Sequence, residues 1–232
     1  MENSDASVKN PLRVIGLETK EEEGLQSMGL VMARAGLGKT AILVQFALDC
    51  MMNGRNVLHV AIGEDLEKTR SWYDDIVSLL KVDPTDINEL MSKRMIMTFQ
   101  EGEFSQAVLA ERIADLEKEG IFTPDCLVID GYNFAGAYRA NIQALRVFAE
   151  NIGIKMMWFS ATCHREDERS SVDGVPAPCH GVGELFETVL QIDPEGEKIE
   201  LKIVKCETCA VNPGTILTLD PSTLLLHEEA SK

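Results

Sequence analysis

The chain has 232 residues, enough for one large α/β domain, and its 45% hydrophobic and 26% charged residues are ordinary for a globular protein. Its 38 acidic residues outnumber the 22 basic ones, so the formal net charge is −16. This balance argues against a broad basic face for DNA or RNA, and we therefore expect that nucleic acid is not a partner.

The first 27 residues are predicted to form an N-terminal tail and a lead-in to the folded domain. Residues 1–10 are small and polar and lack the apolar core of a signal peptide, and we interpret the acidic run at 21–23 as a solvated turn or helix end. No later stretch of about 20 apolar residues is present to span a membrane. We therefore expect a cytoplasmic protein that does not contact membranes and whose six cysteines are free thiols.

From residue 28 the chain alternates short apolar runs with helical patterns. An apolar run over 28–33 meets a glycine-rich loop, and apolar residues at helical spacing predict a helix over 40–53 that ends at Gly54. Four more strands and four more helices are expected, the strands at 57–62, 94–99, 126–130 and 155–160, and the helices at 67–80, 84–91, 105–118 and 141–151. This order is typical of an α/β fold with a mostly parallel central sheet and helices on both faces.

The pattern changes after Thr162. Residues 163–179 are polar and contain Ser, Pro and Gly, so we expect a long mobile loop. An antiparallel C-terminal extension of the sheet is expected to follow, with a hairpin turn at 194–197 and short strands at 188–192, 200–205, 215–219 and 224–226. The folded domain is thus expected over 28–226, with a C-terminal tail at 227–232.

The loop between the first strand and the first helix has the pattern of a phosphate-binding loop, formed by Ala33, Arg34, Ala35, Gly36, Leu37, Gly38, Lys39 and Thr40, with Ala41 following. Gly36 and Gly38 allow a tight path on which backbone N–H groups converge on an anion at the positive end of a helix. Lys39 is expected between the β- and γ-phosphates of a nucleotide, and Thr40 is expected to ligate Mg²⁺. The alternative is a glycine turn at a helix start that binds nothing.

Acidic residues follow two of the predicted strands at their carboxyl ends, where ligands gather in an open α/β sheet. Asp130 ends a buried strand and is expected to be the carboxylate on the Mg²⁺ side, although such a residue can also merely cap a turn. Glu64 and Asp65 follow the strand at 57–62, and Glu64 is expected to polarise a water molecule for attack on the γ-phosphate. The alternative is that both residues cap the next helix.

Four segments in this order resemble the RecA-like P-loop ATPases, and within them the RadA, KaiC and DnaB branch, over residues 28–226. The segments are 33–40, 61–65, 127–130 and 201–205. The resemblance implies a RecA-like fold, ATP and Mg²⁺ as ligands, and assembly with copies of itself or with another protein. It also implies that Glu64 is the catalytic glutamate and that Ser160 or Thr162 senses the γ-phosphate.

The sequence departs from this branch in two places. In the branch a late strand ends in Lys, Asn and Arg, whose basic groups reach the ATP of the neighbouring subunit; here Lys205 matches, but Glu207 stands at the arginine position. The loop at 163–179 falls where such proteins place a DNA-binding loop, yet four acidic residues offset Arg165 and Arg169. Slow hydrolysis and weak DNA binding are the corresponding expectations.

The sequence is consistent with three functions. The leading one is an ATP- and Mg²⁺-binding ATPase with slow hydrolysis and a regulatory or assembly role. The alternatives are a recombination or helicase-loader accessory ATPase that binds single-stranded DNA, and a nucleotide-dependent scaffold that does not hydrolyse ATP.

Two further features bear on the site. Cysteine and histidine side chains could supply a zinc site, namely those of Cys206, Cys209 and the two Cys-His pairs at 163–164 and 179–180. Cys206 and Cys209 alone could form a disulfide or a redox switch, although we expect ordinary free thiols. Trp72 and Tyr73 are expected to pack on the sheet rather than stack on a nucleotide base.

Overall fold

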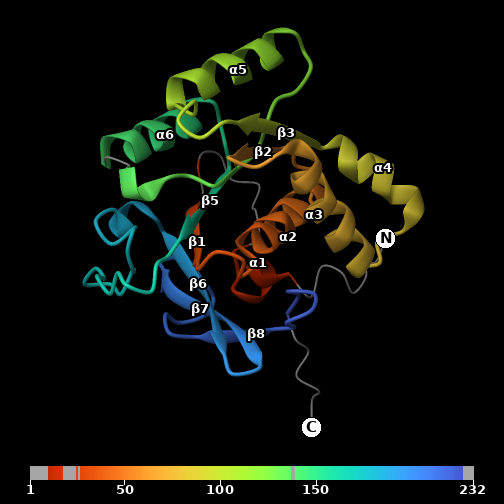
Figure 1. The fold of residues 1–232 in the computed structure, drawn as a ribbon. Coiled ribbons are helices and arrows are strands. Elements are labelled where there is room, and N and C mark those ends of the chain that lie inside the picture. The colour runs from red at the N-terminus through yellow and green to blue at the C-terminus, as the bar shows by residue number, and fades with distance from the viewer. Residues whose placement is uncertain (1–9, 18–24, 26, 137–138, 227–232) are drawn as a thin grey trace.

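The computed structural model describes residues 10–17, 25, 27–136 and 139–226, and its described strands form one eight-stranded sheet (Figure 1). In chain order the strands are β1 (Ser27–Ala33), β2 (Val57–Ile62), β3 (Arg94–Phe99), β4 (Cys126–Asp130), β5 (Met156–Thr162), β6 (Thr188–Glu195), β7 (Lys198–Cys206) and β8 (Ile216–Leu219). The helices are α1 (Pro11–Val14), α2 (Lys39–Met52), α3 (Leu66–Leu79), α4 (Pro84–Ser92), α5 (Gln106–Lys118) and α6 (Arg139–Asn151).

The sheet has the strand order β3-β2-β4-β5-β1-β6-β7-β8. Its first six strands are parallel, and β7 pairs in the antiparallel sense with both β6 and β8. The expectation of an antiparallel extension from residue 188 is therefore wrong for β6, which pairs in parallel with β1. The reason is that the long connection after β5 is a crossover, and only such a connection lets the next strand run parallel. The segment at 224–226 forms an isolated bridge between Leu219 and Leu226 instead of a strand.

Helices cover both faces of the parallel strands, as the alternating pattern predicts. Alternate residues of β1 point to opposite faces: Val31 belongs to the core under α1–α4, and Leu30 belongs to the core under α5 and α6 (Figure 1). The middle of the sheet therefore has apolar residues on both sides, which explains why its strands read as continuous hydrophobic runs.

Helix α2 follows the glycine-rich loop and is buried over most of its length, from Ala41 to Met51. Phe46 packs against Trp158 of β5, with ring centroids 4.5 Å apart. The indole of Trp158 lies over Gly29 of β1, where a Cβ atom would come within 2.4 Å of the ring. The helix that begins at the candidate loop is thus held rigidly against the centre of the sheet.

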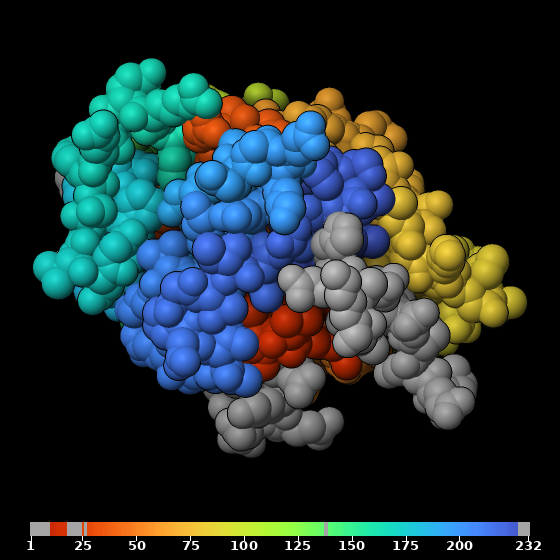
Figure 2. All heavy atoms as spheres, turned by 90° about the horizontal axis from the view of Figure 1, so that it is seen from below, coloured from red at the N-terminus to blue at the C-terminus, as the bar shows by residue number. Residues whose placement is uncertain are grey.

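The N-terminal lead-in is partly folded onto this helix. Asn10 donates from its side chain to the backbone oxygen of Gln45 at 2.6 Å, and Arg13 forms an ion pair with the buried Asp49. Leu12 and Ile15 are fully buried, and Figure 2 shows this segment in red beside the C-terminal strands in blue. Residues 10–17 therefore belong to the folded domain, whereas the predicted tails at 1–9 and 227–232 and the acidic run at 21–23 lie outside the described residues.

The polar segment at 163–179 is anchored in the core in its second half. Ser170 and Pro176 form an antiparallel bridge, and the Ala177 N–H donates to the backbone oxygen of Arg169 at 2.8 Å. Val175 and Cys179 are fully buried on the face covered by α5 and α6. Apolar residues within a polar stretch therefore fold this connection back onto the sheet.

The cysteines are not all free thiols, because Cys206 and Cys209 form a disulfide with Cα atoms 5.6 Å apart. Their spacing at the end of β7, where the chain turns, brings both side chains within bridging range. A disulfide leaves neither sulfur as a zinc ligand, and within residues 10–17, 25, 27–136 and 139–226 no group of three or more His, Cys, Asp or Glu side chains could hold a metal ion. None of the helices in those ranges is long and apolar enough to cross a membrane.

Candidate functional site

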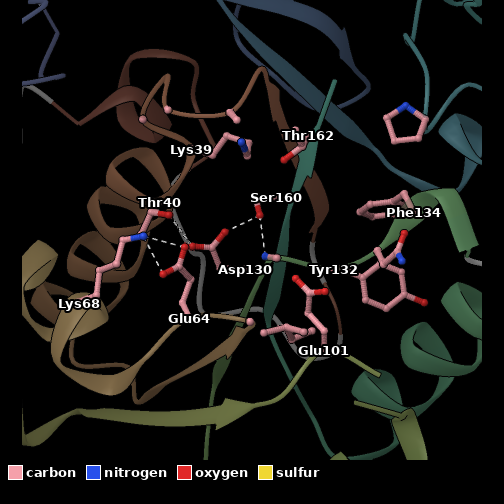
Figure 3. A pocket seen from close by; sticks show the side chains of 18 of the residues that line it. Lys39, Thr40, Glu64, Lys68, Glu101, Asp130, Tyr132, Phe134, Ser160 and Thr162 are labelled. Carbon is pink, nitrogen blue, oxygen red and sulfur yellow. Dashed lines mark hydrogen bonds and ion pairs between the residues drawn. The ribbon is translucent and has the colours of Figure 1, made fainter. Parts of the chain in front are cut away.

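A cleft of about 580 Å³ opens at the carboxyl ends of the parallel strands (Figure 3). The glycine-rich loop and the ends of β2, β4 and β5 contribute its walls. Nine of the predicted site residues line it together: Ala35, Gly36, Gly38, Lys39, Thr40, Glu64, Asp130, Ser160 and Thr162. Residues separated by more than 120 positions in the chain thus meet at one edge of the sheet, as the parallel topology requires.

The glycine-rich loop has the backbone shape that anion binding needs. Gly36 and Gly38 have φ angles of 79° and 89°, in the left-handed region that favours glycine, and Gly38 is the N-cap of α2. At Gly38 a Cβ atom would also come within 2.3 Å of the Leu224 side chain. Lys39 and Thr40, the first residues of α2, line the cleft, so the unpaired N–H groups and the positive dipole end of this helix are available to attract an anion there.

A hydrogen-bond network connects the loop to the acidic strand end. The Thr40 hydroxyl donates to Asp130 Oδ2 at 2.6 Å, and the Ser160 hydroxyl donates to Asp130 Oδ1. Ser160 in turn accepts from the Gly131 N–H at 2.9 Å. Asp130 and Ser160 are only 7% and 1% exposed. Ser160 is therefore fully engaged in orienting Asp130, while Thr162 lies partly exposed at the cleft surface.

These oxygen atoms fit a magnesium ion. Mg²⁺ is a hard cation that prefers oxygen ligands and is usually held by one or two protein groups, with water and substrate phosphates completing its shell. The Thr40 hydroxyl and the Asp130 carboxylate lie within hydrogen-bond distance of one another beside the loop. The pair could hold a magnesium ion directly or through its water molecules once a phosphate is present.

Lys39 lies at the start of α2 with its ammonium turned back into the loop. Its Nζ donates to the backbone oxygen of Arg34 at 3.3 Å. Burial lowers the pKa of Lys39, and the nearby Asp130 carboxylate opposes this shift. A partly desolvated ammonium attracts an anion more strongly than one in bulk water, so Lys39 is well placed for a phosphate oxygen.

Glu64 and Asp65 have separate roles at the end of β2. Asp65 is the N-cap of α3, and its Oδ1 accepts from the Lys68 N–H at 2.7 Å. The capping alternative is therefore correct for Asp65. Glu64 lines the cleft instead, and its carboxylate forms an ion pair with the Lys68 ammonium at 2.7 Å.

The remaining predicted residues lie outside the cleft lining. Ala33 ends β1 and Ala41 is buried in α2, while Arg34 and Leu37 line a neighbouring depression next to His164. Lys205 donates to the backbone oxygen of Phe186 at 2.7 Å and pairs with Glu207, so in this chain its ammonium does not reach the cleft.

Several cleft residues were not predicted from the sequence, namely Lys68, Trp72, Glu101, Tyr132, Phe134, His164, Pro178 and Leu224. Glu101 follows the end of β3 as Glu64 follows the end of β2, so the same positional reasoning could have found it. Leu224 comes from the C-terminal segment and contacts the loop only through the tertiary fold, which no local pattern indicates. Trp72 lines the cleft, although Tyr73 packs in the core as expected.

No protein-family model matches the chain, and no curated protein matches it. The ligand of the cleft must therefore be inferred from the residues that line it.

Proposed function

We propose that the chain is a RecA-like ATPase that binds ATP with Mg²⁺ in this cleft. The observation that carries the proposal is the network in which Thr40 of the loop and Ser160 of β5 both bond to Asp130 of β4. A glycine-rich loop alone occurs in many settings. Here its hydroxyl residue is paired with a buried acid from another strand, which is the arrangement that nucleotide-bound magnesium requires. The strand order, with β5 between β4 and β1, supports a RecA-like fold.

The proposed binding mode gives each residue a separate task. The N–H groups of the loop and Lys39 hold the β- and γ-phosphates, and Thr40 and Asp130 hold the magnesium ion. When bound, magnesium neutralises phosphate charge in the transition state. Thr162 faces the terminal phosphate from the end of β5, and Ser160 keeps Asp130 in position.

Hydrolysis in this site would use Glu64 as general base. A water oxygen forms a bond to the γ-phosphorus while the bond to the β,γ-bridging oxygen breaks, and the electron pair of that bond leaves with ADP. Glu64 accepts the proton of the attacking water. The carboxylate is paired with Lys68 in this structure, so hydrolysis requires the pair to separate. A pair that persists when ATP is bound would favour the second candidate, a scaffold that binds ATP without hydrolysing it.

A regulatory or assembly role accounts best for the rest of the molecule. The acidic surface does not favour a motor that tracks along DNA. Lys205, which the family resemblance would place on the nucleotide of a neighbouring subunit, is held by Phe186 and Glu207. We therefore propose a slow ATPase whose nucleotide state controls assembly with copies of itself or with a protein partner.

The substitution Lys39→Ala tests nucleotide binding. It removes the charge-assisted contacts to two phosphates and should weaken ATP binding by roughly 100-fold or more. Isothermal titration calorimetry measures the affinity, and the fluorescence of Trp72 in the cleft wall provides a second readout. Lys118→Ala is the matched control, because Lys118 is exposed in the last turn of α5 and does not line the cleft. Equal ATP affinity in the Lys39 variant and the wild type would contradict the proposal.

A further inference from the structure

Lys68 lines the cleft, but the binding mode proposed above gives it no contact with the nucleotide. It lies in the first turn of α3, and the Asp65 cap fixes its backbone through a 2.7 Å hydrogen bond. Its side chain lines the same cleft as Thr40 and Asp130 and extends toward the Glu64 carboxylate (Figure 3). The cap therefore fixes the backbone of Lys68 at a point from which its side chain lines the cleft.

Lys68 forms an ion pair with Glu64 that it can exchange for a contact with another anion. Its Nζ lies 2.7 and 2.8 Å from the two oxygens of Glu64. This hydrogen bond raises the pKa of Lys68, so the side chain stays positive at neutral pH. The two side chains are 57% and 44% exposed, and an exposed ion pair of this kind is weak because water competes with it.

The charge balance of the cleft favours such an exchange when a triphosphate is bound. Among the described residues that line the cleft, the lysine and arginine side chains are those of Lys39 and Lys68, whereas Glu64, Glu101 and Asp130 are acidic. A triphosphate adds several negative charges next to these carboxylates, and like charges at close range repel. In the proposed binding mode Lys39 already contacts the phosphates from the loop, so Lys68 is the second lysine that can supply a counter-charge.

We propose that Lys68 is a second phosphate-binding lysine, which leaves Glu64 for a γ-phosphate oxygen and thereby selects triphosphates over diphosphates. The inference rests on the proposed nucleotide function, because it assumes that the loop holds the β-phosphate. A diphosphate lacks the terminal group, so Lys68 stays with Glu64 when a diphosphate is bound.

The departure of Lys68 from Glu64 also affects Glu64 as the proposed general base. While paired with Lys68, the Glu64 carboxylate is engaged at both oxygens. Once the ammonium moves to the phosphate, Glu64 is free to accept a hydrogen bond from water. One residue thus couples the presence of a γ-phosphate to the release of the proposed general base, which limits turnover to the correctly loaded state.

The test compares two nucleotides in one variant. Lys68→Met keeps most of the aliphatic stem and removes the charge. It should weaken binding of the non-hydrolysable ATP analogue AMP-PNP by roughly tenfold, the size expected for one charge-assisted contact. Binding of ADP should stay within about twofold, since ADP has no group for this lysine to contact. Calorimetry with Mg²⁺ measures both affinities, and Lys68→Arg, which retains the charge, should preserve the preference.

Arg70→Met is the matched control. Arg70 lies in the same helix, forms an exposed ion pair with Glu67 and does not line the cleft, so its loss should leave both affinities unchanged. The inference is wrong if Lys68→Met weakens the binding of both nucleotides equally, or the binding of neither. The proposed function still stands in that case if the wild-type protein binds both nucleotides and the Lys39→Ala variant binds neither. If wild-type protein binds neither nucleotide, the proposed function and this inference fail together.

Discussion

Three acidic side chains line the cleft, and their surroundings make them chemically different. Asp130 is buried and accepts from two hydroxyl groups, so it is fixed in one orientation. Glu64 is half exposed and ion-paired, so it can move. Glu101 lies beside Gly63, where a Cβ atom would approach the Glu101 side chain to 3.1 Å. A rigid acid suits magnesium, whereas a mobile one suits proton transfer.

This difference leads to a prediction for Glu64→Gln. The amide keeps the shape of the side chain but cannot accept a proton, so turnover should fall by about two orders of magnitude. Affinity for ATP should remain near that of the wild type, because Glu64 contributes no phosphate contact. A phosphate-release assay and calorimetry measure the two quantities.

Glu67→Gln serves as the control, since Glu67 is exposed in the first turn of α3, three residues after Glu64, and does not line the cleft. Undiminished turnover in Glu64→Gln would place the base elsewhere. Asp65 directly follows Glu64, but its carboxylate caps α3. Glu101, the remaining carboxylate on that wall, would then be tested.

At the scale of strands and helices, local patterns predicted most of the parallel core. The strands β2, β3 and β4 have the expected bounds, because each is a short apolar run ended by a turn signal. The four-residue helix α1 was missed, since one turn has too few residues to display a period. The direction of β6 was also missed, because the apolar pattern of a strand is the same in either direction and only the tertiary crossover decides it.

The same distinction between local pattern and tertiary fold applies to the candidate site. Lys39, Thr40 and Asp130 were predicted because their motif and their place at strand ends are local properties, and the structure brings them together. Lys68 and Leu224 were not predicted to line the cleft. Their positions depend on a helix cap and on a C-terminal segment that the fold returns to the loop.

The contact between β1 and β5 provides a test of the core. Gly29→Ala would place a methyl group within 2.4 Å of the Trp158 ring, between two neighbouring strands that cannot move apart easily. Such overpacking should lower the free energy of unfolding by about 1–3 kcal/mol. Gly181→Ala is the control, because no atom lies within 4 Å of the added methyl group. Urea denaturation followed by circular dichroism measures both, and equal midpoints would show that the sheet adjusts without cost.

For the molecule as a whole, the net charge argues against DNA binding, whereas the family resemblance favours it. The resemblance would place DNA along the segment at 163–179, yet Arg169 is already paired with Asp167 at 2.6 Å. The net charge of −16 adds a repulsion that physiological salt only partly screens. The accessory-protein alternative therefore requires a binding energy for which the described residues offer no clear source.

We accordingly expect no binding of single-stranded DNA tighter than about 10 μM at physiological salt, which is ordinary non-specific affinity. Fluorescence anisotropy of a labelled oligonucleotide, with ATP and Mg²⁺ present, measures this affinity. A titration at lower salt is the internal control, since a purely electrostatic contact should strengthen there. Sub-micromolar binding, or ATP turnover stimulated severalfold by DNA, would instead favour the recombination or helicase-loader role.

The central position of β1 has a consequence for how the chain matures during translation. β1 leaves the ribosome before β5 and β6, which are made more than 120 residues later, yet it lies between them in the sheet. Until both arrive, it has no parallel neighbours, and exposed apolar strand edges invite pairing with other chains. The loop that begins at the end of β1 therefore acquires its final shape late, and a nascent chain interrupted before residue 188 would present an open edge to chaperones and proteases.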